Sequence, residues 1–411
     1  MTIFDIFLYL SMILGFFMAF NLGGNDVANS MASAVGARAI TVKQAVYIAG
    51  SLSFVGAVFL GSHVTATISK GIINPEMIAD PKIIMLGMFS SLLAAGLWVF
   101  IATLTALPIS STHSIVGSML GFGLAAGGIG TVNWIILGGV VLSWIISPFF
   151  AATLSFLIFT HIKNTILNQK RFIHQTKKWA PIWVALTFSL VILSFLYKTP
   201  TGKELDLRWW VPLILTAAAF LGIYLGGRFI VHKILAGREK NVDSVENIFK
   251  RMQLLTSCYV ALSHGANDVA NAIGPVVAVY IIAKQHVFVP EAEIPLAILV
   301  LGGLGISMGI TIFGSRVMAT VGERITQLNN TRGFSVDFGA ATTILLASKL
   351  GLPVSSTHAA VGGVAGVGLA RGFKAVDFSV LGKIFMYWVL TVPIAAFTSL
   401  LIFNILKAII L

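Results

Sequence analysis

The chain of 411 residues has few charged side chains and a single cysteine. Charged residues make up 10% of the sequence and hydrophobic residues 57%, with a mean hydropathy of +0.93. An average soluble domain carries about 25% charged residues, so this composition excludes an ordinary soluble domain and indicates a protein of the lipid bilayer. The lone Cys258 excludes an internal disulfide or a thiolate metal cluster, and we expect it to be a small buried apolar residue.

Long apolar runs fill most of the chain. No basic segment precedes the first run, from Met1 to Phe20, so we expect a retained helix and not a cleaved signal. Because a spanning helix needs about 20 apolar residues, the sequence predicts an all-α polytopic membrane protein with about 12 transmembrane helices. The expected crossings lie near residues 3–37, 41–65, 83–107, 112–128, 132–160, 179–197, 210–231, 254–283, 296–320, 335–350, 356–370 and 377–409.

The formal net charge of +12 could indicate a nucleic-acid partner, but the basic residues lie in loops between apolar spans. The segment 161–178 holds five Lys or Arg residues and no acid. Cytoplasmic loops of membrane proteins are enriched in Lys and Arg. Placing this segment inside assigns sixteen basic residues to inner loops and eight to outer loops. We therefore expect a multi-pass protein with both termini outside and no nucleic-acid partner.

Two polar motifs each occur twice within the apolar sequence. The motif Gly-Asn-Asp-Val-Ala-Asn at 24–29 recurs with Ala in place of Gly at 266–271, and Pro-Ile-Ser-Ser-Thr-His at 108–113 recurs with Val in place of Ile at 353–358. The offsets between copies are 242 and 245 residues, so both order and spacing are kept. A third stretch, Gly61 to Ile68, resembles Gly314 to Val321. The chain therefore contains an internal repeat.

The predicted topology orients the two copies oppositely. Five crossings precede the basic segment, so the first copy enters the membrane from outside and the second from inside. We expect two inverted repeats, residues 1–160 and 254–411, joined by a basic linker with two additional transmembrane helices at 161–253. Inverted repeats with broken helices at the midplane are the arrangement in which many secondary transporters hold their substrate.

The Asn-Asp motifs have the chemistry of a cation site. An ionised carboxylate inside a bilayer needs a cation, a proton or a bound partner, and neither motif contains Lys or Arg. Hard oxygen ligands suit Na⁺, and Gly23, Gly24 and Gly265 permit unwinding that frees main-chain carbonyls. Alternatively, these side chains cap a broken helix or hold helices together. The candidate Na⁺ ligands are Asn25, Asp26, Asn29, Asn267, Asp268 and Asn271.

The Ser-Ser-Thr motifs have the chemistry of an oxyanion site. Pro108 and Pro353 each break a span and precede three hydroxyl residues that open a Gly-rich helix. A helix start presents free N–H groups and a positive dipole end, and neutral donors release an anion more readily than an arginine clamp would. Alternatively, these residues only cap the helices. The candidate anion-binding residues are Ser110, Ser111, Thr112, Ser355, Ser356, Thr357, Asp26 and Asp268.

Histidine follows each hydroxyl triplet, at His113 and His358. Either imidazole could donate to the anion or carry a proton near neutral pH. The simpler interpretation is a hydrogen bond to a neighbouring carbonyl.

These four motifs resemble those of the PiT inorganic phosphate transporters, and the resemblance covers essentially the whole chain. It implies a polytopic secondary transporter for inorganic phosphate, driven by Na⁺ in some members and H⁺ in others. It also implies inverted repeats, dimerisation, an elevator-like movement, and a phosphate and cation site formed by the two Asn-Asp and two Ser-Ser-Thr motifs. Animal members differ in carrying a Glu in the stretch aligned with His63 to Thr67, where this chain has Ala66, and a large hydrophilic loop that is absent here.

The chemistry of phosphate agrees with this resemblance. Phosphate near neutral pH keeps a proton that sulfate lacks, so an acceptor such as Asp26 or Asp268 would favour phosphate. Two aspartates and a phosphate anion together require compensating cations in a low dielectric. We expect a homodimeric Na⁺-coupled phosphate importer of the cell membrane, without a resident cofactor.

The motifs are also compatible with other functions. An H⁺-coupled phosphate permease or a sulfate permease could use the same scaffold, and an anion channel would need no buried aspartates. An intramembrane hydrolase would need a serine within reach of a histidine base. Ser111 and His113 lie close together in sequence at one helix start and point in different directions. We therefore expect that the protein is not an enzyme.

Overall fold

The computed structural model describes residues 2–61, 72–74, 77–78, 80–198, 202, 205, 207–236, 241–287, 294–349 and 354–411. Nearly all of this described chain is helical, and its only β pairing is an isolated bridge between Ile73 and Val132. The predicted all-α membrane fold is therefore confirmed.

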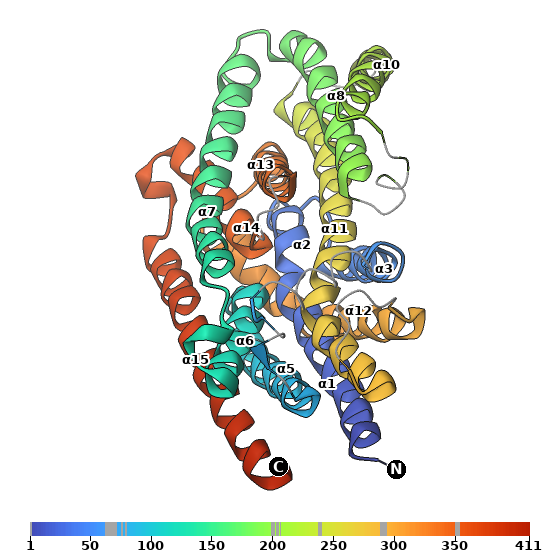
Figure 1. Ribbon diagram of the computed structural model, residues 1–411. Helices are drawn as coiled ribbons and strands as arrows, with labels where there is room; N and C mark the ends of the chain where they lie inside the picture. The colour runs from blue at the N-terminus through green and yellow to red at the C-terminus, as the bar shows by residue number, and fades with distance from the viewer. Residues whose placement is uncertain are drawn as a thin grey trace.

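The bounds of the helices are α1 Ile3–Asp26, α2 Ala28–Gly36, α3 Val42–Leu60, α5 Pro81–Leu104, α6 Ser111–Gly127, α7 Trp134–Ile162, α8 Phe172–Lys198, α10 Val211–Ala236, α11 Val242–Gln285, α12 Leu296–Ala319, α13 Asn330–Lys349, α14 Ser356–Arg371 and α15 Phe378–Ile410. Helices α7, α11 and α15 run along the length of the molecule in Figure 1, whereas α3, α10 and α13 are seen nearly end-on.

Polar side chains set many of the helix starts. Thr2 and Asp5 form a reciprocal capping box at α1, and Thr41 and Gln44 form the same arrangement at α3. Asp80 accepts from the backbone of α5, which has proline at its first position. These caps satisfy N–H groups that would otherwise be unpaired where each helix begins.

Nine helices of the described chain are long and apolar enough to cross a membrane. The expected crossings at 112–128, 335–350 and 356–370 are not among them. They correspond to α6, α13 and α14, of which α6 has 17 residues and α14 has 16. The turn between α5 and α6 lies inside the bundle, where Asn25 of α1 donates to Leu107 O at 3.0 Å. Helices α5 and α6 therefore form a hairpin that reaches the interior.

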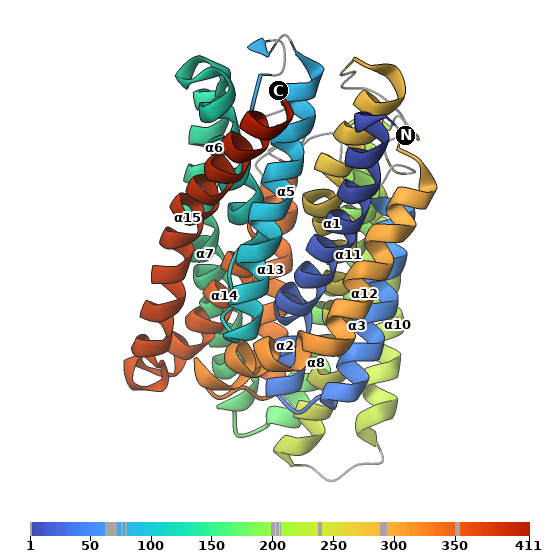
Figure 2. The same ribbon diagram turned by 90° about the horizontal axis from the view of Figure 1, so that it is seen from below.

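Both termini lie at one end of the molecule, and the basic segment between α7 and α8 lies at the opposite end (Figures 1 and 2). The outer helices expose large apolar side chains, including Ile135 at 90%, Phe149 at 72% and Phe397 at 67%. Lipid-facing surfaces have this character because the bilayer core offers no water to polar groups.

The short helices pack on long helices that are distant in sequence. Helix α6 lies against α15, where a side chain at Gly121 would meet Ala396 O at 2.0 Å. Helix α14 lies against α7, where a side chain at Gly366 would meet Ala152 O at 2.1 Å. Small residues allow this close approach of two backbones in a membrane protein. The first hairpin is thus covered by the last helix, and the α13–α14 pair by α7.

Candidate functional site

The first Asn-Asp motif meets the second hydroxyl motif in the centre of the bundle. The side-chain amide of Asn29, in α2, donates to Ser356 Oγ at 3.1 Å and to Thr357 Oγ1 at 2.9 Å. The Thr357 hydroxyl donates in turn to Asp26 Oδ1 at 3.3 Å. Residues separated by more than 300 positions along the chain therefore share one polar cluster.

The second Asn-Asp motif meets the first hydroxyl motif. The side-chain amide of Asn271, in α11, lies 3.4 Å from Ser111 Oγ and 3.5 Å from Thr112 Oγ1. The duplicated motifs thus pair crosswise, each Asn-Asp motif with the hydroxyl motif of the other copy. All four motifs are brought together, as the sequence predicted.

Both aspartates are buried, and they lie close to each other. The exposed fraction is 0% for Asp26 and 6% for Asp268. Asp26, Asp268 and His264 each offer a ligand atom, and these atoms all lie within 4.8 Å of one another. Asp26 Oδ2 has no hydrogen-bond partner among the described residues. Two carboxylates at this spacing repel each other when both are ionised, so the cluster is suited to hold positive charge between them.

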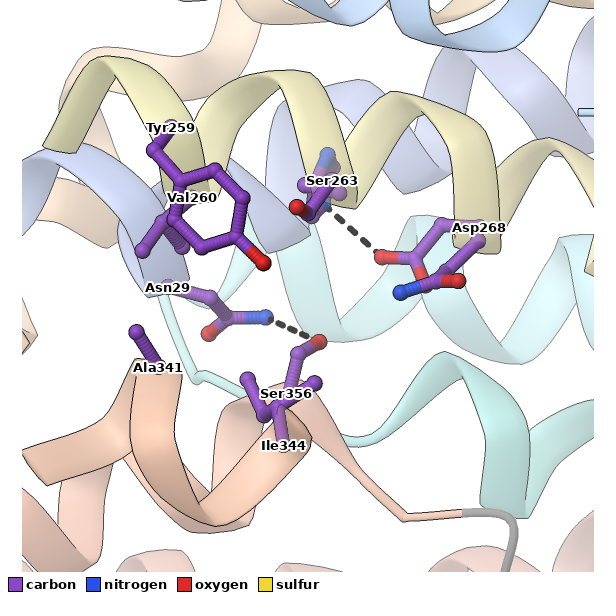
Figure 3. Close-up of a pocket in the computed structure, with 10 residues that line it drawn as sticks. Asn29, Tyr259, Val260, Ser263, Asp268, Ala341, Ile344 and Ser356 are labelled. Atoms are coloured by element: carbon purple, nitrogen blue, oxygen red, sulfur yellow. Dashed lines mark hydrogen bonds and ion pairs between the residues drawn. The ribbon is translucent and has the colours of Figure 1, made fainter. Parts of the chain in front are cut away.

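A small cavity opens beside Asp268 at the junction of α2, α11, α13 and α14. In Figure 3 the Asn29 amide points across this cavity toward Ser356, with Asp268 on the opposite wall. The described lining contains amide, hydroxyl, imidazole and carboxylate groups, but no Lys or Arg. An anion held here would therefore be bound by neutral donors and by added cations.

Ser110 and Ser355 cap the two short helices. Ser110 Oγ accepts from the backbone N–H of His113 at 3.3 Å, and Ser355 Oγ accepts from that of His358 at the same distance. Each side chain is 1% exposed. Capping, the alternative interpretation of the hydroxyl motifs, therefore accounts for the first serine of each motif in this structure, whereas the next two residues face the asparagines.

Asn25 and Asn267, which occupy equivalent motif positions, have different surroundings. Asn25 donates to Thr103 Oγ1 and Leu107 O, and its oxygen accepts from the backbone N–H of Ile109 at 3.2 Å. Asn267 is half-buried and lines the cavity. Asn25 thus holds the hairpin turn, and Asn267 faces the space beside Asp268.

The expected unwinding of both Asn-Asp motifs is wrong in detail. Helices α1 and α2 are interrupted at Val27, three residues after Gly24, but α11 runs without a break through Gly265. A side chain at Gly23 would meet Ile306 O at 2.0 Å, and one at Gly265 would meet Ser53 O at 2.0 Å. These glycines permit close packing of helices in this structure and do not free main-chain carbonyls.

Sequence reasoning missed His264. Its Nε2 lies 2.9 Å from Asp268 Oδ2, and the side chain is almost fully buried. A difference between the two copies could have pointed to this histidine: the first copy has Leu22 at the equivalent position.

Sequence reasoning also missed Asp337 of α13. Its carboxylate accepts from Ser257 Oγ at 2.6 Å and from Ser33 Oγ, and the side chain is buried. No described Lys or Arg pairs with it. The available signal was an acid within an apolar span, which by itself suggests a functional group.

Two predicted elements lie outside the described residues. Pro353 is one of them. The other is most of the third repeated stretch, from Ser62 to Ile68. The structure therefore does not test whether Gly61 to Ile68 is equivalent to Gly314 to Val321.

Comparisons with known proteins agree with the geometry. Residues 22–399 match the model of the phosphate transporter family. A protein of Thermococcus kodakarensis named "Putative phosphate permease" is 47% identical over 411 residues, covering 99% of each chain. "Inorganic phosphate transporter 2-1, chloroplastic" of Arabidopsis thaliana is 37% identical over 422 residues, covering 94% of this chain and 70% of that protein.

A solved structure has the same fold. It is described as "The sodium-dependent phosphate transporter", superposes with a TM-score of 0.89 and is 48% identical, covering 98% of this chain and 100% of that chain. The family match extends over the Asn-Asp and hydroxyl motifs that meet in the centre of the bundle. The chain therefore belongs to the phosphate transporter family.

Proposed function

We propose that this protein imports inorganic phosphate across the cell membrane by Na⁺ symport, and that the crossed motifs form its binding site. The observation that carries this proposal is that two buried aspartates and hydroxyl groups from two helix starts lie together. Asp268 and Ser356 of this cluster line a cavity whose described lining has no Lys or Arg. Such a site supplies donors for an anion and oxygen ligands for cations at the same place.

Phosphate fits this combination of groups better than sulfate does. The hydroxyls of Ser111, Thr112, Ser356 and Thr357 and the N–H groups of two helix starts can donate to anion oxygens. Asp26 and Asp268 are acceptors, which pair with the proton of a phosphate P–O–H group but repel sulfate. We assign these six residues, with the capping Ser110 and Ser355, to the phosphate site.

Coupling to cations follows from charge. Two aspartates and a mono- or divalent phosphate total −3 or −4, and burying this sum requires two or more positive charges. Amide and carboxylate oxygens of the Asn-Asp motifs suit a hard monovalent cation. Each bound Na⁺ makes phosphate binding more favourable, and reciprocity requires phosphate to favour Na⁺ equally. The description of the structural neighbour as sodium-dependent supports this choice over H⁺.

Alternating access, in this proposal, is an elevator-like movement. The site is divided between α1, α2 and α11 on one side and the starts of α6 and α14 on the other. Displacement of one group against the other would carry or open the site. We further propose a homodimer with both termini outside, which light scattering of the purified protein and accessibility labelling of terminal tags would test.

The decisive experiment is uptake of labelled phosphate into proteoliposomes. An inward Na⁺ gradient should drive accumulation, whereas an equal K⁺ gradient should not. Excess sulfate should not compete. Accumulation under K⁺ with a pH gradient of the same size would assign the coupling to H⁺, and competition by sulfate would assign a broader oxyanion permease.

A further inference from the structure

The two histidines that follow the hydroxyl motifs are joined to two tryptophans in a closed arrangement. The His113 ring lies 3.7 Å from that of Trp144, and the His358 ring lies 3.8 Å from that of Trp388, measured between ring centroids. The two imidazoles contact each other edge to face at 4.5 Å. We call these four residues the His-Trp tetrad. Each is at most 7% exposed.

Each histidine of the tetrad stacks on one tryptophan and hydrogen-bonds to the backbone of the other. His113 Nδ1 lies 3.3 Å from the backbone oxygen of Trp388, on which His358 stacks. His358 Nδ1 lies 2.9 Å from the backbone oxygen of Trp144, on which His113 stacks. Each tryptophan therefore supports one histidine with its ring and accepts a hydrogen bond from the other. The offsets of 245 and 244 residues show that the whole tetrad is part of the duplication.

The hydrogen bonds determine the protonation of both imidazoles. A carbonyl oxygen can only accept, so each Nδ1 must carry the proton of a neutral ring. Nε2 of both rings is buried and has no hydrogen-bond partner among the described residues. A second proton there would place an unpaired charge in an apolar environment. The hydrogen bond to a carbonyl, the simplest interpretation of these histidines, is therefore present in both copies, and neither ring has a described partner for a second proton.

The tetrad lies at the point where the two hydroxyl motifs are anchored. His113 directly follows Thr112 and donates its backbone N–H to Ser110, and His358 has the same relation to Thr357 and Ser355. Helix α6 packs along α15 and α14 along α7, and the His113–His358 contact joins the starts of the two short helices. In addition, the Trp388 indole N–H donates to Pro108 O at 3.2 Å, in the turn before Ser110.

We propose that the His-Trp tetrad is a positioning unit that sets the separation of the two hydroxyl triplets and thereby the affinity for phosphate. An anion bound from two sides requires donors held within about 0.5 Å of their binding geometry, and the tetrad is the place where both sets of donors are held to each other. The inference rests on the proposed function, because it takes the hydroxyl triplets as the phosphate site.

Substitution of His358 by Leu removes both the ring contacts and the hydrogen bond to Trp144. It should raise the KM for phosphate about 10-fold, the lower end of what loss of a supporting residue costs at a metal site, with little change in the maximal uptake rate. His358→Asn keeps an N–H donor near the position of Nδ1 and should recover a substantial part of the affinity. His113→Leu should act in the same way.

The double variant tests whether the two histidines act together as one unit or support the hydroxyl motifs independently. If both histidines act through one tetrad, the KM of His113→Leu/His358→Leu should rise by clearly less than the product of the two single effects. A matched control is His161→Leu. His161 also contacts two tryptophans, at 4.7 Å and 5.6 Å between ring centroids, but it lies in the last turn of α7 and far from the motifs in the sequence. This variant should keep the original KM.

The result that would overturn the inference is an unchanged KM in His358→Leu and His113→Leu while Thr357→Ala raises it. An unchanged KM in Thr357→Ala as well would contradict the proposed phosphate site itself. If the leucine variants do not yield folded protein, His358→Asn decides alone. Loss of its ring contacts should raise KM about threefold, and an unaltered KM would overturn the inference.

Discussion

The two copies of the Asn-Asp motif are almost identical in sequence but have different surroundings. In the first copy the helix is interrupted at Val27, and Asn25 is bound to the turn of the α5–α6 hairpin. In the second copy α11 is continuous, Asn267 faces the cavity, and His264 lies against Asp268. The repeat thus fixes the position of each group, whereas the neighbouring residues determine which ligand that group can bind.

Removing the carboxylate charge of either Asn-Asp motif is the strongest test of whether the two motifs have equivalent roles. Asp26→Asn and Asp268→Asn should each lower Na⁺-driven phosphate uptake at least about 30-fold, because loss of one partner in a buried charged site costs about 2–5 kcal/mol. Initial uptake rates in proteoliposomes would measure this. A variant that keeps more than a third of the original rate would show that only the other copy holds a coupling ion.

The next largest effect is expected at His264, where the copies differ. His264→Leu gives the second copy the residue of the first copy and removes the group 2.9 Å from Asp268 Oδ2. The Na⁺ concentration for half-maximal uptake should rise about 10-fold, the lower end of what loss of a neighbour that orients a metal ligand costs in metal affinity. His161→Leu is the control for loss of a histidine. An unchanged Na⁺ dependence would show that the difference between copies has no role in cation binding.

The hydroxyl motifs should also differ from each other. Thr357 is hydrogen-bonded to Asn29 at 2.9 Å, Asp26 at 3.3 Å and Ile109 O at 3.2 Å, whereas among the described residues the side chain of Thr112 has a single contact, with Asn271 at 3.5 Å. Thr357→Ala should therefore raise the KM for phosphate about 5- to 10-fold and Thr112→Ala about twofold, at about 1 kcal/mol per lost hydrogen bond. Equal increases would contradict the asymmetry seen in these contacts.

The smallest effect concerns stability. Asn25→Ala removes three hydrogen bonds to the hairpin region, two of them to its backbone. It should lower the melting temperature, because each buried group left unpaired costs about 1–3 kcal/mol. Asn267→Ala, at the equivalent half-buried position, should melt close to the original protein. Thermal unfolding of both variants in detergent, followed by tryptophan fluorescence, would compare them; a larger shift for Asn267→Ala would reverse the assignment of roles.

Much of this arrangement could be predicted from the sequence. Apolar runs are a local property, so the helical membrane fold followed from composition, and the duplicated motifs predicted that distant segments would meet. The course of α6 could not be predicted, because hydropathy does not distinguish a short helix that begins inside the protein from one that crosses the membrane. Likewise, the crosswise pairing of Asn29 with Ser356 depends on packing between helices that are far apart in the sequence.

Glycine and histidine show a second limit of sequence reasoning. Gly265 could serve either an unwound helix or close packing, and only its neighbour Ser53 decides between them. His264 and Asp337 each occur once, without a repeated partner at the equivalent position, so a search for duplicated residues did not find them. A search for duplicated motifs therefore does not find candidate residues that lack a counterpart in the other copy.

The central claim is that both motif pairs form one site for phosphate and its cations. Calorimetric titration of the purified protein with phosphate, in Na⁺ and in matched K⁺ buffer, tests it most directly. We predict one phosphate per chain, binding in Na⁺ only, and weakened by Ser111→Ala and by Ser356→Ala alike. Two phosphates per chain, or an affinity that responds to only one of the two serines, would contradict a single shared site.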